Sequence, residues 1–464
     1  MKPSHRVRPV FDDPNLVSAA GLLPVLELAG AAGIDGLLAG LTVPSPNAAL
    51  KTTSLVAAML AGADCIDDTD LLRHGGMGRV FTGIRAPSTL GTFLRCFTHG
   101  HVQQLDRAGA GLLGGLAARV PALFGETSSR GSDRSWVFLD VDDTVREVHG
   151  YAKQATAFGY TGVRGLNVQL ATISSPTSAP VIARARLRRG NTASATGVGR
   201  LLAQAINTAR TAGVTTPILA RADSAYYGHA FVSTAVAHRV AFSVTARMTA
   251  TVRTAIASVE EGAWTPIRYP HAIFDAEQQR WISDAEVAEV GFVAFTGRRK
   301  TEHVRCRLVV RRVRRLQPPA SDGSAQGELF AAHRHHAFIT NTTPDTLDTV
   351  AADQVHRGHA IVEQVIAELK DNALAHLPSG RYAANAAWVS CAVMAFNLAR
   401  AAAVAAKLTT ARWATVRTHI ITVPARLATT GRRLVLHLPN HWPWATAFNQ
   451  LWATATGPPP IPTP

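Results

Sequence analysis

The chain has 464 residues, of which 47% are apolar and 17% charged, and its 47 basic and 32 acidic side chains give a formal net charge of +15. This length allows about three domains, and the apolar content supplies a core, which excludes wholesale disorder. Only six basic residues are lysine, so arginine, whose planar fork suits phosphate, carries most of the excess. We therefore expect a polyanionic partner such as nucleic acid, although a genome rich in G and C also enriches arginine.

The cysteines and the apolar stretches indicate the compartment. Cys65, Cys96, Cys306 and Cys391 show no C-x-x-C spacing, which favours free thiols in a reducing compartment over a disulfide framework or a zinc site. The charged N-terminus has no apolar core of signal-peptide length. Residues 383–406 are the most apolar stretch, but they include Asn and Arg, so we expect a buried helix and no contact with a membrane.

The pattern along the chain predicts four segments. Residues 1–130 have helical spacing and scattered arginines, which fits a DNA-binding domain or a helical bundle with a solvated basic face. Residues 131–248 follow a mixed α/β pattern, which predicts the first part of a core sheet. Residues 249–345 alternate strand-like runs with loops and include the most basic stretch, which predicts a β-rich insertion. Residues 346–464 return to helices, as the last part of the core, and end in a Pro-rich tail that we expect to be disordered.

The predicted core is made of short apolar runs that end in turn residues. The expected strands are 136–142, 166–173, 181–187, 217–223 and 240–245, with a helix at 198–212. In the insertion, the expected strands are 264–269, 290–295, 304–313 and 336–340.

Acidic residues occur at the ends of two of these predicted strands and on a later helix. Asp140 and Asp142 lie two apart on a strand and share one face, while Asp223 ends another strand. Glu363 lies on a helix whose one stripe also holds His356, His359 and Lys370. Carboxylates that face one another need a cation, and pairs of Mg²⁺ ions meet this need in phosphodiester chemistry. The alternative is that they are ordinary solvated or capping acids, with Asp223 as a helix N-cap.

The residues around these acids resemble a known family. The stretches Leu139–Val145 and Arg221–Tyr226, together with Glu363 followed seven residues later by Lys370, resemble the DDE transposases of bacterial insertion sequences, in particular the group with a Tyr-Arg-Glu-Lys signature. The stretches 157–162, 189–192, 384–388 and 395–398 support the resemblance, which spans about residues 10–435. It implies an RNase H-like core interrupted by a β-rich insertion between the second Asp and the Glu, and it implies a cytoplasmic, nucleoid-associated bacterial protein.

The resemblance also implies the site residues. Asp142, Asp223 and Glu363 would be the catalytic triad that holds two Mg²⁺ ions (or Mn²⁺), with Asp140 as the alternate first ligand and Lys370 near DNA phosphate. The sequence departs from the signature at two positions, because His356 replaces the Tyr and His359 replaces the Arg. We list both with the nearby Arg357 as DNA-binding candidates. A transition-metal site formed by His356, His359 and Glu363 is an alternative.

The family's insertion is expected to hold a Trp that stacks on a flipped base. Trp264 and Trp281 lie in the matching segment, and a half-buried sheet Trp is the alternative for each. Arg311 and Arg312 belong to the basic run 305–315, which we expect to bind the DNA backbone unless it is a solvated strand face.

The predicted function is that of a transposase. The resemblance implies Mg²⁺-dependent nicking of double-stranded DNA at the element's inverted repeats, attack of the freed 3′-hydroxyl on target DNA, and a homodimer in a synaptic complex. The alternatives are a catalytically inactive DNA-binding protein descended from such an enzyme and a metal-dependent nuclease without strand transfer.

Overall fold

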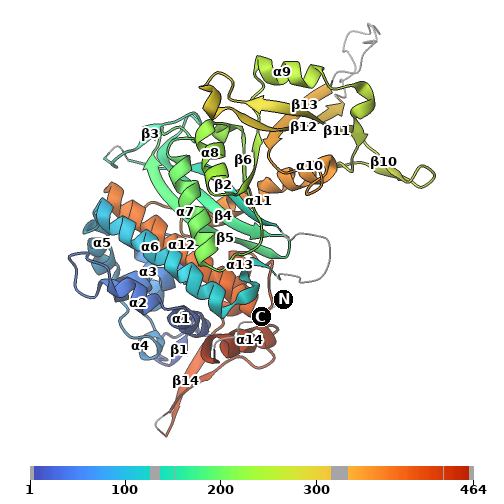
Figure 1. Cartoon of the computed structure of the whole chain (residues 1–464). Coiled ribbons are helices and arrows are strands. Elements are labelled where there is room, and N and C mark those ends of the chain that lie inside the picture. Colours follow the sequence, from blue (N-terminus) through green and yellow to red (C-terminus); the bar gives the residue numbers. More distant parts are fainter. Residues whose placement is uncertain (1–4, 126–135, 151, 315–332, 432, 459–464) are drawn as a thin grey trace, which may run out of the picture.

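A computed structural model describes residues 5–125, 136–150, 152–314, 333–431 and 433–458 (Figure 1). One long mixed sheet, covered by helices, runs through the described chain. Most of the Pro-rich tail and the C-terminal end of the basic run at residue 315 lie outside the described residues.

Five strands form the core of the sheet in the order β5-β4-β2-β6-β7. They are β2 (Val137–Glu147), β4 (Arg164–Ser175), β5 (Ser178–Arg189), β6 (Ile218–Ala222) and β7 (Ala241–Thr245). Strands β2, β4 and β5 are antiparallel neighbours, whereas β6 and β7 run parallel to β2. Three antiparallel strands followed by two parallel ones give the RNase H-like arrangement, so the predicted fold class is confirmed. A short strand, β3 (Ala157–Phe158), also pairs with β4.

Helices cover the faces of this core sheet. Helix α7 (Val198–Thr211) buries its apolar stripe against β4 and β5 and also contacts α8 (His229–Ala237). Helix α12 (Tyr382–Ala405) packs against β5, where the Asn397 amide bonds both backbone groups of Ile182. Within the described chain, α12 is the helix long and apolar enough to cross a membrane, but almost all of it is buried inside the protein, as expected for a core helix.

The insertion continues the same sheet. Strand β13 (His333–Thr340) pairs antiparallel with β7, and β12 (Val304–Arg314), β11 (Ala285–Ala294) and β8 (Thr265–Pro266) follow it outward. The remaining elements of this segment are α9 (Ala250–Ala257), η4 (Glu261–Ala263), η5 (Lys300–Glu302) and a hairpin of β9 (Ile273–Asp275) and β10 (Arg280–Ile282). The strands expected from sequence are present, although β8 has only two residues and the hairpin was not predicted.

The N-terminal segment is helical, as predicted, and shares a core with the C-terminal helices. Its elements are β1 (Leu16–Val17), α1 (Leu22–Ala31), α2 (Ile34–Ala39), α3 (Ala48–Ala61), η1 (Asp67–Leu72), α4 (Met77–Val80), α5 (Pro87–Arg95), α6 (His99–Arg119), η2 (Pro121–Phe124). Helices α3 and α6 pack directly on α12, and α6 lies beside it over much of its length (Figure 1).

The C-terminal part begins with a helical run that crosses the sheet. It consists of α10 (Thr349–Arg357), the tighter turn η6 (Gly358–Ala360) and α11 (Ile361–Lys370). Helix α10 packs on β11 and β12 of the insertion, whereas α11 packs on β2 and β5 of the core. Short helices and two strands follow α12. They are α13 (Trp413–Val416), η7 (Arg417–Ile421), β14 (Ala425–Thr430), β15 (Arg433–His437) and α14 (Ala445–Thr456). Strands β14 and β15 form a projecting hairpin that pairs with β1 (Figure 1).

Candidate acidic active site

The structure brings Asp142 and Asp223 to neighbouring positions on two parallel strands. Val141 of β2 is paired with Ala222 of β6, so the next residue of each strand is one of these two acids. Asp223 has an extended backbone, with φ −77° and ψ −176°, and its Oδ1 accepts a hydrogen bond from the Ala225 N–H at 2.9 Å. It therefore caps the short helix η3 (Ser224–Tyr226), as the capping alternative expected, while it also stands beside Asp142.

The surroundings of Asp142 disfavour its negative charge. The pKa of Asp142 is raised from 3.8 to about 6, chiefly by burial and also by the charges of Asp223 and Asp143, against the lowering effects of the Asp143 N–H and of His359. That N–H donates to Asp142 Oδ1 at 2.7 Å. A cation bound to both Asp142 and Asp223 would relieve this repulsion, and carboxylate oxygens are the ligands that Mg²⁺ prefers. The donor set at this position thus fits a hard divalent ion.

Glu363 lies on the neighbouring helix and is not part of the compact pair. It occupies the first turn of α11, which packs on β2, and its side chain is exposed without a hydrogen bond or ion pair to any described residue. Its oxygens do not join those of Asp142 and Asp223 in a set spaced within 4.8 Å of one another. The structure therefore places two of the three predicted catalytic acids together and the third on an adjacent element.

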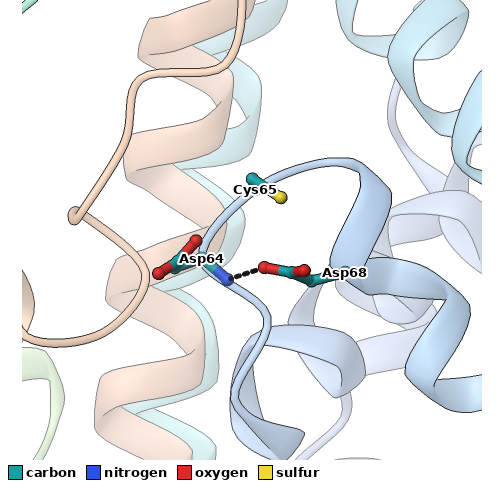
Figure 2. Close-up of side chains that lie close together, drawn as sticks. All are labelled: Asp64, Cys65 and Asp68. Atoms are coloured by element: carbon teal, nitrogen blue, oxygen red, sulfur yellow. Dashed lines mark hydrogen bonds between the residues drawn. The ribbon is translucent and has the colours of Figure 1, made fainter.

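In the described part of the chain, a different trio has that close spacing. Asp64 and Cys65 lie in the loop between α3 and η1, and Asp68 lies in the first turn of η1, in the N-terminal helical segment. Figure 2 shows the Asp68 carboxylate bonded to the Asp64 N–H and the Asp64 carboxylate turned to the other side, where it pairs with His376 at 3.0 Å. A hydrogen bond from the Cys65 thiol lowers the pKa of Asp68. The two carboxylates of this trio already have partners within the protein, so we assign no metal to it.

Asp140, the alternate metal ligand predicted from sequence, is fully engaged by the protein. It is 0% exposed, and Arg221 Nε and Nη2 donate to its two oxygens at 2.7 and 2.8 Å. His359 Nδ1 is 2.9 Å from Oδ1, and the Ser174 hydroxyl donates to Oδ2 at 3.3 Å. Although burial acts to raise the pKa of Asp140, Arg221 and His359 hold it below its usual value. These contacts favour a structural role for Asp140, and its place as the alternate metal ligand stays a prediction.

This buried network joins all three elements of the candidate site. Asp140 precedes Asp142 by two residues on β2, Arg221 precedes Asp223 by two residues on β6, and His359 precedes Glu363 by four residues in the helical run. Arg221 Nη1 also donates to the Val355 carbonyl at 2.6 Å in α10. The network thus fixes how the two strands and the helix stand relative to one another.

His356 faces a different strand from His359, contrary to the predicted shared stripe. Its Nδ1 lies 2.7 Å from the Ser243 hydroxyl and its Nε2 lies 3.0 Å from the Thr245 hydroxyl, while the ring stacks on Phe338 with centroids 4.1 Å apart. Burial lowers the pKa of His356 well below 6.5, so the ring is neutral at pH 7. Its nitrogens are not available to DNA or to a metal, which corrects the DNA-binding assignment and argues against the transition-metal alternative.

Lys370 and Arg357, two predicted DNA-binding residues, have different neighbours: Lys370 lies near Asp142, whereas Arg357 contacts Asp353 and Tyr269. Lys370 ends α11; burial lowers its pKa, as does the charge of Arg146, while the charge of Asp142 raises it. The Lys370 ammonium is therefore close enough to Asp142 to sense its charge, as expected for a phosphate-binding lysine. Arg357 bonds Asp353 through Nε at 2.9 Å and lies over the Tyr269 ring at 5.7 Å.

The two insertion arginines predicted to bind DNA are held inside the protein. Arg311 Nη1 donates to buried Asp353 at 2.7 Å, and Arg312 donates to Glu286 at 2.7 Å and to Glu261 at 2.9 Å. The Arg312 side chain is 11% exposed. Asp353 is buried, whereas Glu261 is 81% exposed. These ion pairs stabilise the insertion, and the DNA contacts of the two arginines stay predictions.

The two candidate tryptophans lie in separate pockets of the insertion. Trp264 stacks under the Arg312 guanidinium at 4.3 Å and lines a pocket of about 680 Å³ with Arg253 and His333. Trp281, on β10, lies under Arg268 at 4.6 Å and lines a pocket of about 510 Å³ with Tyr269 and Arg357. Both rings are half-buried, so the geometry leaves each of them as a stacking candidate.

Sequence analysis missed the polar residues that hold the site in place. Arg221 was not singled out, although an Arg in the middle of a buried apolar strand needs a buried carboxylate partner, and that requirement was the available signal. Asp143, on the opposite face of β2, accepts from Arg188 at 2.8 Å and from the Tyr226 hydroxyl at 2.9 Å. No sequence signal connects Asp143, Arg188 and Tyr226, because they come together only through the order of the strands in the sheet.

The sheet order is RNase H-like, and Asp142 within β2 lies beside Asp223, which directly follows β6. Comparison with known families agrees, because the model described as transposase DDE domain group 1 matches residues 2–456. The chain therefore belongs to that transposase family, whose substrate is DNA. A search of curated proteins finds no match to the chain.

Proposed function

We propose that the protein is the transposase of an insertion sequence, which cleaves double-stranded DNA at the element's ends and transfers the freed 3′-hydroxyl to target DNA. The observation that carries this proposal is the juxtaposition of Asp142 and Asp223 across the β2–β6 ladder, with the charge of Asp142 disfavoured in the absence of a cation. Membership in the transposase family supports the same reaction.

Asp142, Asp223 and Glu363 are the proposed ligands of two Mg²⁺ ions, with Mn²⁺ as a substitute. When bound, these ions would supply the positive charge that activates the attacking oxygen and stabilises the leaving oxygen. Asp142 and Asp223 form the fixed part of the ligand set, and the exposed Glu363 carboxylate, which makes no other bond among the described residues, completes it.

The chain's own cations position the DNA strand. The Lys370 ammonium is close enough to Asp142 for that charge to raise its pKa, and close enough to Arg146 for that charge to lower it. His359 brings an imidazole to the same place, in the position where the family has an Arg, and Asp140 fixes its ring by accepting from Nδ1. A pair of protomers, each holding one element end, is the proposed assembly.

The test is cleavage of a duplex that carries the gene's own flanking repeats, with Mg²⁺ present. Nicking followed by joining to a target plasmid supports the proposal. Binding without cleavage supports the inactive DNA-binding protein, and cleavage without joining supports the nuclease. We expect Glu363→Gln to abolish nicking and spare binding. Asp371→Asn, which neutralises an exposed carboxylate just beyond the end of the same helix, should nick like the unmodified protein. Nicking that survives in Glu363→Gln would remove Glu363 from the ligand set.

A further inference from the structure

A groove with a volume of about 350 Å³ lies in the N-terminal helical segment. Helices α1, α2, α3 and α4 supply Leu26, Ile34, Leu50 and Val80 to its lining, and we call it the α1–α3 groove. The lining is mostly apolar, and the volume is within the range of pockets that bind ligands. None of the residues proposed for DNA cleavage or DNA binding lines the groove, so the function argued so far does not account for it.

The composition of helix α1 explains why the groove is apolar. Val25 and Leu28 face the protein core and are fully buried. Leu23 and Leu26 are three residues apart, so they share another face of the helix, and they line the groove while staying partly exposed. A helix that is apolar on more than one face is normally covered on each of them. The groove face of α1 therefore lacks a covering element within the described part of the chain.

Two carboxylates stand at the rim of this groove. Glu27 on α1 and Asp35 on α2 line it and are exposed, and neither forms an ion pair or a hydrogen bond with a described residue. Acids without a cationic partner are unexpected in a chain whose formal net charge is +15. An occupant that matches the groove therefore carries apolar side chains flanked by positive charge.

Residues 6–11 of the same chain, which we call the arm, have this chemistry. They alternate charged and apolar side chains, in the order Arg6, Val7, Arg8, Pro9, Val10 and Phe11. Pro9 favours an extended backbone at the residue before it, and the arm has neither helix nor strand. An extended backbone places Val7, Pro9 and Phe11 on one face. All six residues are exposed, so this apolar face has no cover either.

The arm stands outside the groove of its own chain. Its anchor is Asp13, which accepts a hydrogen bond from Arg426 of β14 at 3.2 Å, and residues 6–12 can span about 23 Å beyond that anchor. The hairpin β14–β15 also exposes apolar side chains, but there Leu434 lies beside Arg433, whose charge opposes that of the arm. The acid-rimmed groove is the surface that matches the arm, and each molecule presents one open arm and one open groove.

We propose that the arm of one copy docks in the α1–α3 groove of a second copy, so that the protein forms a dimer without DNA. Val7, Pro9 and Phe11 enter the groove, and the two arginines reach the rim carboxylates along their flexible stems. A two-fold axis makes this contact twice, which doubles the surface that it buries. The inference goes beyond the pair of protomers proposed above, because it needs neither DNA nor the acidic site.

Sedimentation velocity of the full chain, without DNA and at low salt, tests the contact. We expect a dimer whose dissociation constant rises about 10-fold or more in Phe11→Ser and in Leu50→Ser. Leu71→Ser is the matched control, because the Leu71 side chain is 45% exposed against 42% for Leu50 but does not line the groove. This control should sediment like the unmodified protein.

Charge reversal separates docking between copies from docking within one chain. The variant Glu27→Arg with Asp35→Arg and the variant Arg6→Glu with Arg8→Glu should each be monomeric, because arm and groove then carry the same charge. Mixed together they should form a dimer, since each arm meets a groove of opposite charge. A monomer at every concentration of the unmodified protein, no association of the mixed variants, or an equal loss in Leu71→Ser would overturn the proposal. DNA cleavage plays no part in these outcomes, so the proposed reaction stands or falls separately.

Discussion

Replacing Asp142 by Asn should stabilise the metal-free protein, although this residue is a proposed catalytic ligand. The pKa of Asp142 rises from 3.8 to about 6 on folding, chiefly through burial, so the folded chain holds a proton that the unfolded chain releases between those pH values. Its stability therefore falls as the pH rises through that interval. At about 1.4 kcal/mol per unit of pKa, the ionised carboxylate costs about 3 kcal/mol at pH 7, and Asn removes that cost while keeping the acceptor for the Asp143 N–H.

Urea unfolding in EDTA, followed by tryptophan fluorescence, measures this effect. The gain in free energy of unfolding for Asp142→Asn should be small near pH 4 and largest at pH 7. Added Mg²⁺ should then stabilise the unmodified protein more than the variant, since it binds only the complete ligand set. Asp143→Asn is the control on the same strand and should destabilise by about 1–3 kcal/mol, because Arg188 loses its buried carboxylate partner. A loss of stability in Asp142→Asn, or a gain that does not vary with pH, would refute the reasoning.

Three further outcomes follow from the contacts around the site. Arg221→Met should lower the free energy of unfolding by about 3–5 kcal/mol, because it leaves the Asp140 carboxylate buried without its cation, and a loss below about 1 kcal/mol in urea unfolding would contradict this account. Lys370→Ala should weaken DNA binding and reduce the slope of log K against log salt by about one, measured by fluorescence anisotropy. His356→Ala should lower stability but leave that slope unchanged, since both ring nitrogens bond β7 hydroxyls; a change in slope would return His356 to the DNA surface.

The core strands were predictable because each contains an apolar run that ends in turn residues, and the runs 166–173 and 181–187 lie inside the observed strands 164–175 and 178–189. Asp140 and Asp142 share a face, as the period of two requires. The helix that carries His356 and His359 was predicted, but not that the two side chains face different strands. The tighter turn at Gly358–Ala360 rotates the second histidine towards β2, while the first faces β7.

The ion pairs of β12 could not be predicted, because sequence does not reveal which partner a strand residue meets. Arg311 and Arg312 find Asp353, Glu286 and Glu261, which lie up to 51 residues away and approach only when β11, β12 and α10 assemble. In the same way, Arg221 and Asp140 come into contact through the parallel pairing of β2 with β6, a long-range event that no local pattern encodes.

The pairing of β13 with β7 limits how the polypeptide could be shortened. Removing residues 249–345 would strip the ladder partners from Ser243, Val244 and Thr245 and leave β7 as an open sheet edge. Such an edge invites pairing with other chains. Asp353 would also lose Arg311, one of its two cations, in a nearly inaccessible place. A trimmed fragment should therefore precipitate, because the segment that interrupts the core covers the edge of β7.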